Sequence, residues 1–239
     1  MEQGGAGQAW RGAGSLDELY GLIRDCRACG LGGTRNNFVF GTGDPHAGMM
    51  FVGEGPGYHE DRQGIPFVGQ AGQFLDQLLG SIGLRRAEVY IANCIKCRPP
   101  GNRDPLPEEL AACTPYLFKQ IELIRPRIIC TLGNFATKTL LKTDVGITRL
   151  HGKRFVRDGM VFVPLFHPAA ALHKPPLKAT LIEDFQLLKA YLEEGWEAAG
   201  AGARPQTAAG ANAGAEDEPG AGDGGDRAEG TEQRQLGLF

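Results

Sequence analysis

Apolar residues along the chain follow two kinds of pattern, short continuous runs and stripes at helical spacing. Four short runs have the length and the flanking residues of buried strands: 49–53, 89–95, 127–132 and 160–166. Helical stripes lie between and after these runs, at 71–82, 107–124, 134–141 and 181–199. Because strands alternate with helices, the pattern predicts an α/β fold, a three-layer α/β/α sandwich with a central, mainly parallel four-stranded sheet.

Composition divides the 239 residues into four segments. Residues 1–14 are rich in glycine and predict a flexible arm, after which Ser15 has the position of an N-cap for a first helix. Residues 15–199 hold the apolar runs and helical stripes and predict one folded domain. Residues 200–234 are dominated by Gly, Ala and acidic residues and predict a disordered linker. Residues 235–239 bring back large apolar side chains, which favours a short binding peptide.

Charge is unevenly distributed. The chain has a net charge of −3, but residues 200–239 hold seven acids and three bases, a net of −4, so the remainder has a net of +1. A near-neutral domain can still carry a local basic patch for phosphate contact. The N-terminus resembles no signal peptide, and no apolar run is long enough to span a membrane. We therefore expect a cytoplasmic protein whose six cysteines serve a metal or catalysis rather than disulfides.

Polar residues follow three of the predicted strands, in the loops 53–69, 93–103 and 167–172. The carboxyl ends of parallel strands meet at one edge of a sheet, so we expect these loops to form the site. Glu54 lies between Gly53 and Gly55, and the surrounding residues match neither a phosphate-binding P-loop nor a dinucleotide fingerprint. A carboxylate would repel phosphate, so Glu54 better suits a developing cation or a water molecule to be deprotonated.

The cysteines include a C-x-x-C pair, Cys26 and Cys29, at the end of the first predicted helix. Cys97 lies in the second loop and Cys113 near the start of the next helix, so these two can complete a set of four thiolates. Such a set suits either zinc or an iron–sulfur cluster, and spacing does not decide between them. Cys94 and Cys130 lie within apolar runs and are expected in the core.

Four stretches together resemble a known family: "GEGPGYHEDRQGIPFVGQAGQFLDQLL", "YIANCIKCRPPGNRDP", "EELAACTPYLFKQI" and "FHPAAAL". They are similar to motifs of the iron–sulfur (family 4) uracil-DNA glycosylases, and the resemblance covers about residues 15–195. It implies one [4Fe-4S] cluster, with a structural role, on Cys26, Cys29, Cys97 and Cys113. A related covalent-binding branch has a basic insert with a reactive histidine after the second motif. That insert is missing here, which favours an ordinary hydrolase.

The resemblance also assigns the chemistry of the three loops. Glu54 is expected to orient or activate water, or to stabilise positive charge on the sugar, and the residues do not separate these roles. His167 is expected to donate a hydrogen bond to uracil O2. Asn93 offers a donor and an acceptor that match uracil O4 and N3–H, whereas cytosine presents the reverse pattern.

Further residues are predicted to contact the base or the DNA. Phe67 is expected to stack on the uracil ring, the backbone at Gly55 to approach the base or water, and Glu60 to block a thymine methyl group. Leu172 is expected to enter the base stack after the base leaves it. Basic residues near the loops are candidates for phosphate contact: Lys96, Arg98, Arg103, Lys174 and Lys178.

The C-terminal "QLGLF" resembles the peptide by which bacterial repair proteins dock on the DNA polymerase sliding clamp. Gln235, Leu236, Leu238 and Phe239 would enter the clamp pocket. The expected protein is thus a monomeric uracil-DNA glycosylase that acts on uracil-containing DNA and starts base excision repair. Two alternatives stay open, a non-catalytic metal-containing module that binds uracil or nucleic acid, and a zinc protein.

Overall fold

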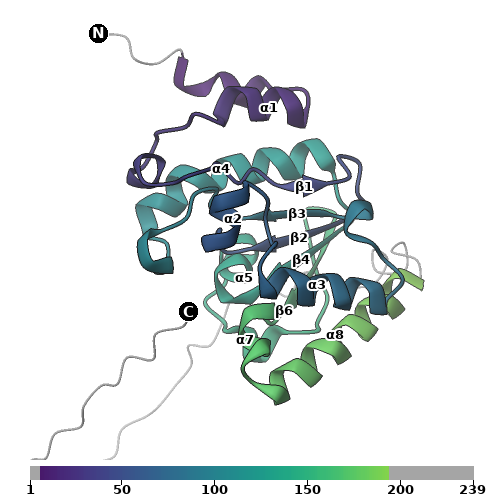
Figure 1. Cartoon of the computed structure of the whole chain (residues 1–239). Coiled ribbons are helices and arrows are strands. Elements are labelled where there is room, and N and C mark those ends of the chain that lie inside the picture. Colours follow the sequence, from purple (N-terminus) through teal and green to yellow (C-terminus); the bar gives the residue numbers. More distant parts are fainter. Residues whose placement is uncertain (1–5, 194–239) are drawn as a thin grey trace, which may run out of the picture. The chain divides into compact units, whose positions relative to one another are not determined.

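A six-stranded sheet forms the centre of the structure, a computed structural model that describes residues 6–193. Its four inner strands are parallel: β3 (Tyr90–Asn93), β2 (Met49–Gly53), β4 (Ile128–Leu132) and β6 (Met160–Leu165). Two short strands close the edges in antiparallel pairing: β1 (Thr42–Gly43) beside β3, and β5 (Phe155–Arg157) beside β6. Figure 1 shows the strands side by side between the helices.

The inner strands match the four apolar runs of the sequence, and this confirms the predicted sheet. The edge strands do not follow from the pattern, because they are only two and three residues long and are partly exposed. A tight turn at Asp158 (φ 50°) and Gly159 (φ 76°) joins β5 to β6, as the Asp-Gly pair predicts. The sheet is therefore mixed at its edges and parallel where the site forms.

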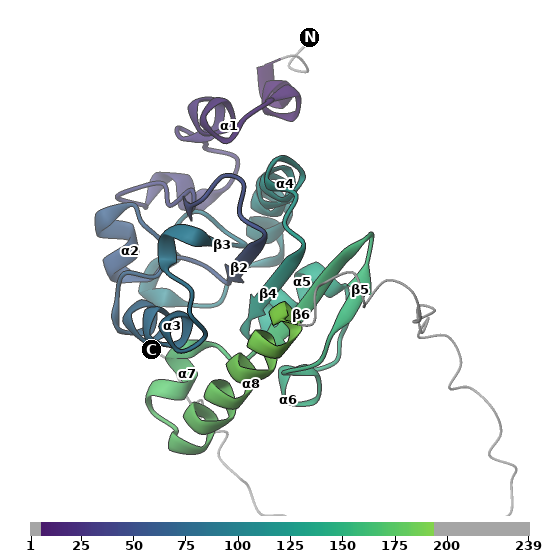
Figure 2. The same ribbon diagram turned by 90° about the vertical axis from the view of Figure 1, so that its right-hand side faces the viewer.

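Two helical layers cover the sheet (Figure 2). On one face, α3 (Gln70–Ser81) and α8 (Pro175–Glu193) place apolar side chains such as Leu75 and Phe185 against Phe51 of the sheet. On the other face, α4 (Pro107–Ile124) and α5 (Gly133–Leu141) pack Leu117 and Ala136 against Val52. Neighbouring residues of β2 point to opposite faces, so a strand covered on both sides must be apolar throughout.

The remaining helices are short. They are α1 (Leu16–Ile23), α2 (Tyr58–Gln63), α6 (Ile147–Leu150) and α7 (Pro168–Leu172), with 3-10 turns η1 (Ala6–Gly12), η2 (Gly30–Gly33), η3 (Arg86–Glu88) and η4 (Pro100–Asn102). The Ser15 hydroxyl accepts a hydrogen bond from the backbone N–H of Glu18, as the N-cap prediction requires. Within residues 6–193, no helix combines the length and the apolar character needed to cross a membrane.

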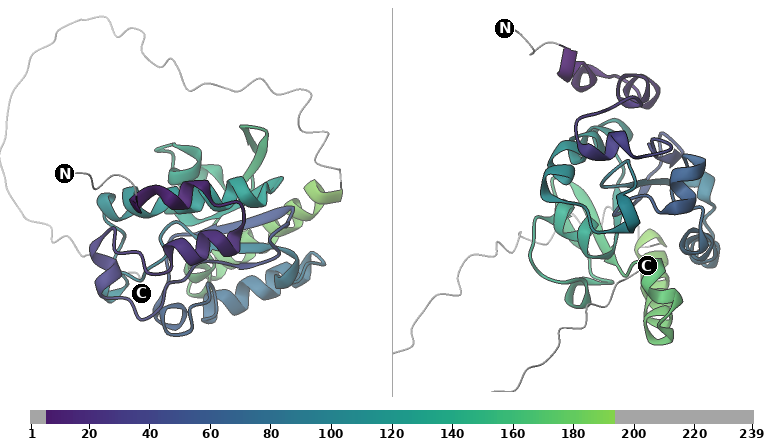
Figure 3. Two further views of the ribbon diagram at one scale, coloured as in Figure 1. Left: turned by 90° about the horizontal axis from the view of Figure 1, so that it is seen from above. Right: turned by 60° about the vertical axis from the view of Figure 1, so that its left-hand side comes forward.

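The predicted bounds of two segments, the N-terminal arm and the last helix, need correction. Residues 1–14 are not a flexible arm throughout, because η1 is ordered and Trp10 packs edge-to-face on Tyr116 of α4 at 4.9 Å between ring centroids. Figure 3 shows η1 and α1 lying along α4. The last helix begins at Pro175 rather than near Leu181, since proline is compatible with a first helical turn. Residues 194–239, with the predicted linker and C-terminal peptide, lie outside the described residues.

Candidate active site and cysteine centre

Strand register places the three loops at the same edge of the sheet, because β3, β2, β4 and β6 run parallel. Gly53 at the end of β2 pairs with Asn93 at the end of β3, so Glu54 leaves the sheet beside the asparagine. A Cβ atom added at Gly53 would lie 2.5 Å from the Asn93 side-chain oxygen and 2.6 Å from the ring of Phe67. Only glycine fits there, because its backbone is in contact with both side chains. This close approach explains one glycine of the Gly-Glu-Gly turn.

Asn93 carries an unusual acceptor. The residue is 2% exposed, and its Oδ1 is the only buried side-chain N or O atom among the described residues that has no hydrogen-bond partner. Leaving such an atom unpaired costs about 1–3 kcal/mol, so native structures rarely do so without a reason. An N–H donor on a bound ligand would remove the cost. Asn93 Oδ1 can therefore accept a hydrogen bond from a ligand.

Phe67 is held in a strained conformation. Its φ is 53°, which is unusual for a bulky side chain, and its ring stacks on His167 with centroids 5.7 Å apart at 27°. The backbone of α3 fixes this shape, since a Cβ at Gly72 would lie 1.8 Å from the Phe67 carbonyl oxygen. Strained residues concentrate at ligand sites, where the surrounding fold holds them in place. The two aromatic rings therefore lie against each other, and the Phe67 ring also reaches Gly53.

Glu60 supports the same loop. Its Oε1 accepts hydrogen bonds from the backbone N–H groups of Val68 and Gly69, both at 2.9 Å. These amides flank the first turn of α3, where a carboxylate also offsets the helix dipole. The structure thus gives Glu60 a role in positioning Phe67. Its predicted contact with a methyl group stays a prediction.

His167 lies between β6 and α7, and its tautomer follows from its contacts. Its Nδ1 accepts a hydrogen bond from the backbone N–H of Ala169 at 3.1 Å, which assigns the ring proton to Nε2. Burial lowers the pKa of His167 to about 4, although the charge of Glu60 opposes that shift. At neutral pH the ring is therefore an uncharged hydrogen-bond donor. Gly133 (φ 87°) leaves room for it, since a Cβ there would lie 3.1 Å from the His167 Cβ.

Glu54 is half-buried at the end of β2, and its backbone carbonyl accepts the N–H of Ile95 at 3.0 Å. Burial raises the pKa of its carboxyl to about 7, with a further contribution from the negative charge of Asp104. A carboxyl with such a pKa can take up or release a proton near neutral pH. Next to it, a Cβ at Gly55 would lie 2.7 Å from the side chain of Ile95, so Gly55 lets the turn pack on that residue.

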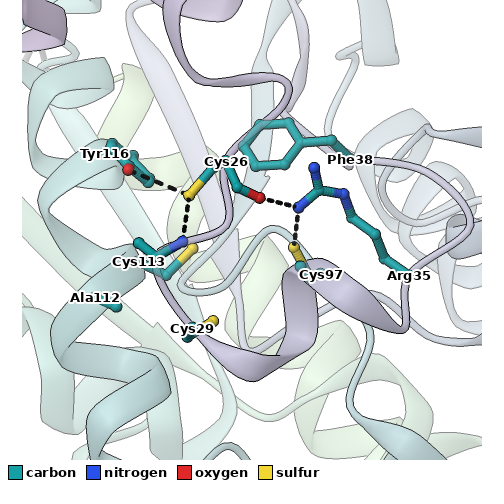
Figure 4. A pocket seen from close by; sticks show the side chains of 10 residues that line it. Cys26, Cys29, Arg35, Phe38, Cys97, Ala112, Cys113 and Tyr116 are labelled. Carbon is teal, nitrogen blue, oxygen red and sulfur yellow. Dashed lines mark hydrogen bonds between the residues drawn. The ribbon is translucent and has the colours of Figure 1, made fainter. Parts of the chain in front are cut away.

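The four predicted ligand cysteines, Cys26, Cys29, Cys97 and Cys113, line one pocket (Figure 4). Donors approach three of the sulfurs. The Tyr116 hydroxyl lies 3.3 Å from Cys26 Sγ, Arg35 Nη1 donates to Cys97 Sγ at 3.2 Å, and the N–H of Lys96 donates to Cys113 Sγ at 3.2 Å. Hydrogen bonds to sulfur and a nearby cation favour thiolates, the form that binds metal.

Thiols are the metal-binding groups of this pocket. Among residues 6–193, no group of three or more His, Cys, Asp or Glu side chains is close enough to hold one metal ion. A cluster of several irons and sulfides keeps its thiolate ligands farther apart than one tetrahedral ion does. Four thiols around one pocket are a donor set that fits an iron–sulfur cluster, and zinc also accepts such donors. Cys94 and Cys130 are buried in the two sheet cores, as predicted.

The structure corrects one predicted DNA contact. Lys96 is fully buried, and its Nζ donates to the Asn93 backbone oxygen at 2.9 Å and to Gln120 Oε1 at 2.6 Å. It cannot reach a phosphate, because β3 and α4 enclose it. The sequence pattern shows only a lysine in a polar loop, and nothing in it indicates that the side chain turns inward.

The other predicted DNA contacts remain accessible. Arg103 is exposed but forms two hydrogen bonds to Glu109, at 2.9 and 2.7 Å. Arg98 lies over the Tyr58 ring at 5.2 Å and donates to Asn102 Oδ1. Leu172 is partly buried at the end of α7, while Lys174 is exposed beside it. Lys178 has its ammonium 5.2 Å from the Phe74 ring.

Sequence reasoning misses two residues that shape these sites. Arg35 donates to Cys26 O at 2.8 Å as well as to Cys97 Sγ, and no motif marks it. Burial is the main cause of the raised pKa of Glu54, and the negative charge of Asp104 is the second. In the sequence, only the position of Asp104 in the loop after β3 could have indicated this role. Both act across distances in sequence that a local pattern cannot reveal.

Comparison with known proteins assigns the family. The model of the uracil DNA glycosylase superfamily matches residues 40–193. A type-4 uracil-DNA glycosylase of Sulfurisphaera tokodaii is 44% identical over 184 residues, covering 73% of this chain and 84% of that protein. Those of Archaeoglobus fulgidus and Thermotoga maritima are 44% and 42% identical and cover 72% of this chain, with 90% and 92% of their own lengths matched. The chain therefore belongs to the type-4 uracil-DNA glycosylases of the uracil DNA glycosylase superfamily.

Proposed function

We propose that this protein removes uracil from DNA by hydrolysing its N-glycosidic bond, which leaves an abasic site and starts base excision repair. The observation that carries the proposal is the buried, unpartnered Oδ1 of Asn93 beside the Phe67 ring. A nucleobase that stacks on the ring and offers an N–H to that oxygen satisfies both groups at once. A base in a duplex can reach such a site only after it has left the stack.

Asn93 supplies the specificity. Its Oδ1 accepts N3–H of uracil, and its Nδ2 is then free to donate to O4. Cytosine presents an acceptor at N3 and a donor at C4, so both contacts would become repulsive. A buried polar group left unpaired in this way costs about 1–3 kcal/mol per group, which supports strong discrimination between the two bases.

His167 and Glu54 act on the charges that develop as the bond breaks. Negative charge grows on the leaving uracil, and the neutral His167 ring donates from Nε2 to uracil O2, which stabilises that charge. Positive charge grows on the sugar, and the Glu54 carboxylate stabilises it or activates the attacking water. The low pKa of His167 suits this role, because a neutral donor needs no counter-charge in the site.

Contacts to the DNA surround this centre. We assign phosphate contact to Arg98, Arg103 and Lys174, and insertion into the base stack to Leu172. Leu172 lies at the end of α7, the short helix that follows His167. One segment therefore positions both the leucine that would enter the base stack and the histidine that would contact uracil.

We assign one [4Fe-4S] cluster to Cys26, Cys29, Cys97 and Cys113. When bound, the cluster supplies structural cross-linking, because hydrolysis of this bond transfers no electrons. Cys26 and Cys29 follow α1, whereas Cys97 follows β3 and Cys113 lies in α4. The ligands thereby join the N-terminal segment to the loop that carries Asn93.

The test of the function is excision from a uracil-containing oligonucleotide by the wild type, Asn93→Asp and His167→Ala. We expect alkali-labile sites with the wild type and losses of at least roughly a hundredfold in both variants. Leu22→Ala, an exposed change on α1, should excise normally. Unchanged rates in both site variants would remove the assigned site, and binding without cleavage by the wild type would favour the non-catalytic module.

We also propose that Gln235, Leu236, Leu238 and Phe239 dock on the bacterial sliding clamp, on the strength of their resemblance to clamp-binding peptides. Deletion of 236–239 should abolish pull-down of the clamp and leave excision intact. A monomeric state and a cytoplasmic location stay predictions, which size-exclusion chromatography and fractionation would check.

A further inference from the structure

Lys96 is a buried cation without a carboxylate partner. Its side chain is among the largest that are fully buried, and none of the ion pairs among residues 6–193 includes it. Burying an isolated ammonium is costly unless nearby negative charge compensates it. The thiolates of the cysteine centre are the available source. Cys97 is the next residue in the chain, and Cys113 Sγ accepts the backbone N–H of Lys96 at 3.2 Å, so two of the four thiols lie beside this residue.

The ammonium of the same residue holds the recognition asparagine. Nζ donates to the backbone oxygen of Asn93 at 2.9 Å, three residues back in the chain. Lys96 therefore holds the backbone oxygen of the residue whose side-chain amide is proposed to bind the base. A shift of the Asn93 peptide would move Oδ1 away from the base.

Gln120 of α4 completes the arrangement. Its Oε1 accepts from Lys96 Nζ at 2.6 Å, while its Nε2 donates to Phe40 O at 3.0 Å and to the Tyr90 hydroxyl at 3.2 Å. Tyr90 begins β3 and Asn93 ends it, so both ends of the strand are tied to one glutamine through Lys96. Fully satisfied buried networks of this kind fix a single geometry.

We propose that Lys96 is a positioning residue for uracil recognition, which fixes the Asn93 peptide and whose charge is balanced by the thiolate-bound cluster. This inference rests on the proposed excision of uracil. It couples the cysteine centre to the base-reading amide through one side chain. The cluster then contributes to recognition by stabilising a buried cation as well as by cross-linking segments.

Lys96→Met tests the proposal, because methionine has a similar length and no charge. We expect kcat for excision to fall about ten- to a hundredfold, with little change in KM. The reduction potential of the cluster should also become more negative, since a nearby positive charge is lost. Lys96→Gln, which is neutral but can donate one hydrogen bond, should recover part of the excision rate and show a similar shift in potential.

Lys119→Met is the matched control, since Lys119 lies on the same helix as Gln120 and pairs only with exposed Glu122 among the described residues. It should change neither excision nor potential. If Lys96→Met fails to fold, Gln120→Leu replaces it and should lower excision while leaving the potential near that of the wild type.

Three results would overturn the inference: wild-type excision in Lys96→Met, wild-type excision in Gln120→Leu, or a fall in excision that merely follows loss of the cluster's visible absorbance. A wild-type protein that does not excise uracil would instead overturn the proposed function. The two failures are thus distinguishable.

Discussion

At the residue scale, the site is defined by groups whose environments are unfavourable without a substrate. Asn93 keeps a buried oxygen unpaired, Phe67 has a strained backbone, and Glu54 has a raised pKa. Each of these costs free energy in the free protein. They lie around the end of β2, where the proposed mechanism places a base and a water molecule. This concentration of strain and perturbed acidity is typical of an active site.

The pH dependence of excision should follow the ionisation of the Glu54 carboxyl group. The proposed mechanism uses its ionised form, and its pKa lies at about 7, so the rate should rise as the pH rises through that value. Asp104→Asn removes a charge that raises this pKa, so the midpoint should move to lower pH. Asp158→Asn, in the exposed turn before β6, should leave the profile unchanged. A midpoint that moves to higher pH in Asp104→Asn would contradict the assignment.

Glu54→Gln should stabilise the fold while it abolishes excision. The folded state raises the pKa of Glu54, so the ionised group costs stability above its ordinary pKa of 4.5, and the cost is complete above about pH 7. With allowance for partial exposure, the gain should be about 1–2 kcal/mol at pH 8 and much smaller at pH 5. Urea unfolding at both pH values measures it. A larger gain at pH 5 than at pH 8 would show that the sign is wrong.

At the element scale, α3 and the ends of β2 and β3 position the side chains of the candidate site. The first turn of α3 touches the Phe67 backbone at Gly72, and Glu60 binds the amides that precede this turn. The register of β2 with β3 places Gly53 beside Asn93. Helix α3 thus fixes the position of Phe67, and the sheet fixes the positions of Asn93 and Glu54.

Two glycines of α3 give a matched test. Gly72→Ala would place a Cβ 1.8 Å from the Phe67 carbonyl oxygen, so the loop must move. We expect a loss of about 1–3 kcal/mol in the free energy of unfolding and a clear fall in excision. Gly80→Ala meets no atom within 4 Å and should stabilise the helix by up to about 1 kcal/mol. Equal effects of the two changes in urea unfolding would exclude the contact as the cause.

The N-terminal turn η1 should protect the cysteine centre. Trp10 packs on Tyr116, and the Tyr116 hydroxyl contacts Cys26 Sγ. Trp10→Ala should therefore speed the loss of cluster absorbance in air at least several-fold, because solvent gains a path to the pocket. Leu22→Ala on the exposed side of α1 serves as the control. Equal rates of bleaching would show that the turn does not shield the centre.

At the scale of the whole molecule, the sequence predicts the inner sheet and its helices because apolar runs and stripes record burial directly. The ends of α4, at Pro107 and Ile124, agree with the pattern, since a first-turn proline marks the start. The sequence also predicts that Glu54, Asn93 and His167 lie at the same edge of the sheet, because the carboxyl ends of parallel strands share an edge.

Features that depend on contacts between distant segments do not follow from the pattern. The inward turn of Lys96, the ordered Trp10 and the influence of Asp104 all arise from partners many residues away. The two edge strands are too short to leave a periodic signal. Local sequence therefore indicates which residues are buried and where the chain turns. The charge and position of individual polar groups depend on tertiary contacts, which the local pattern does not show.

The most direct test of the account is a crystal structure of Glu54→Gln bound to an oligonucleotide that contains uracil. We predict an extruded uracil stacked on Phe67, with N3–H donated to Asn93 Oδ1 and O2 accepting from His167 Nε2. A uracil that lies elsewhere, with Asn93 Oδ1 still unpartnered, would contradict the central claim that these three strand ends form the base-reading site.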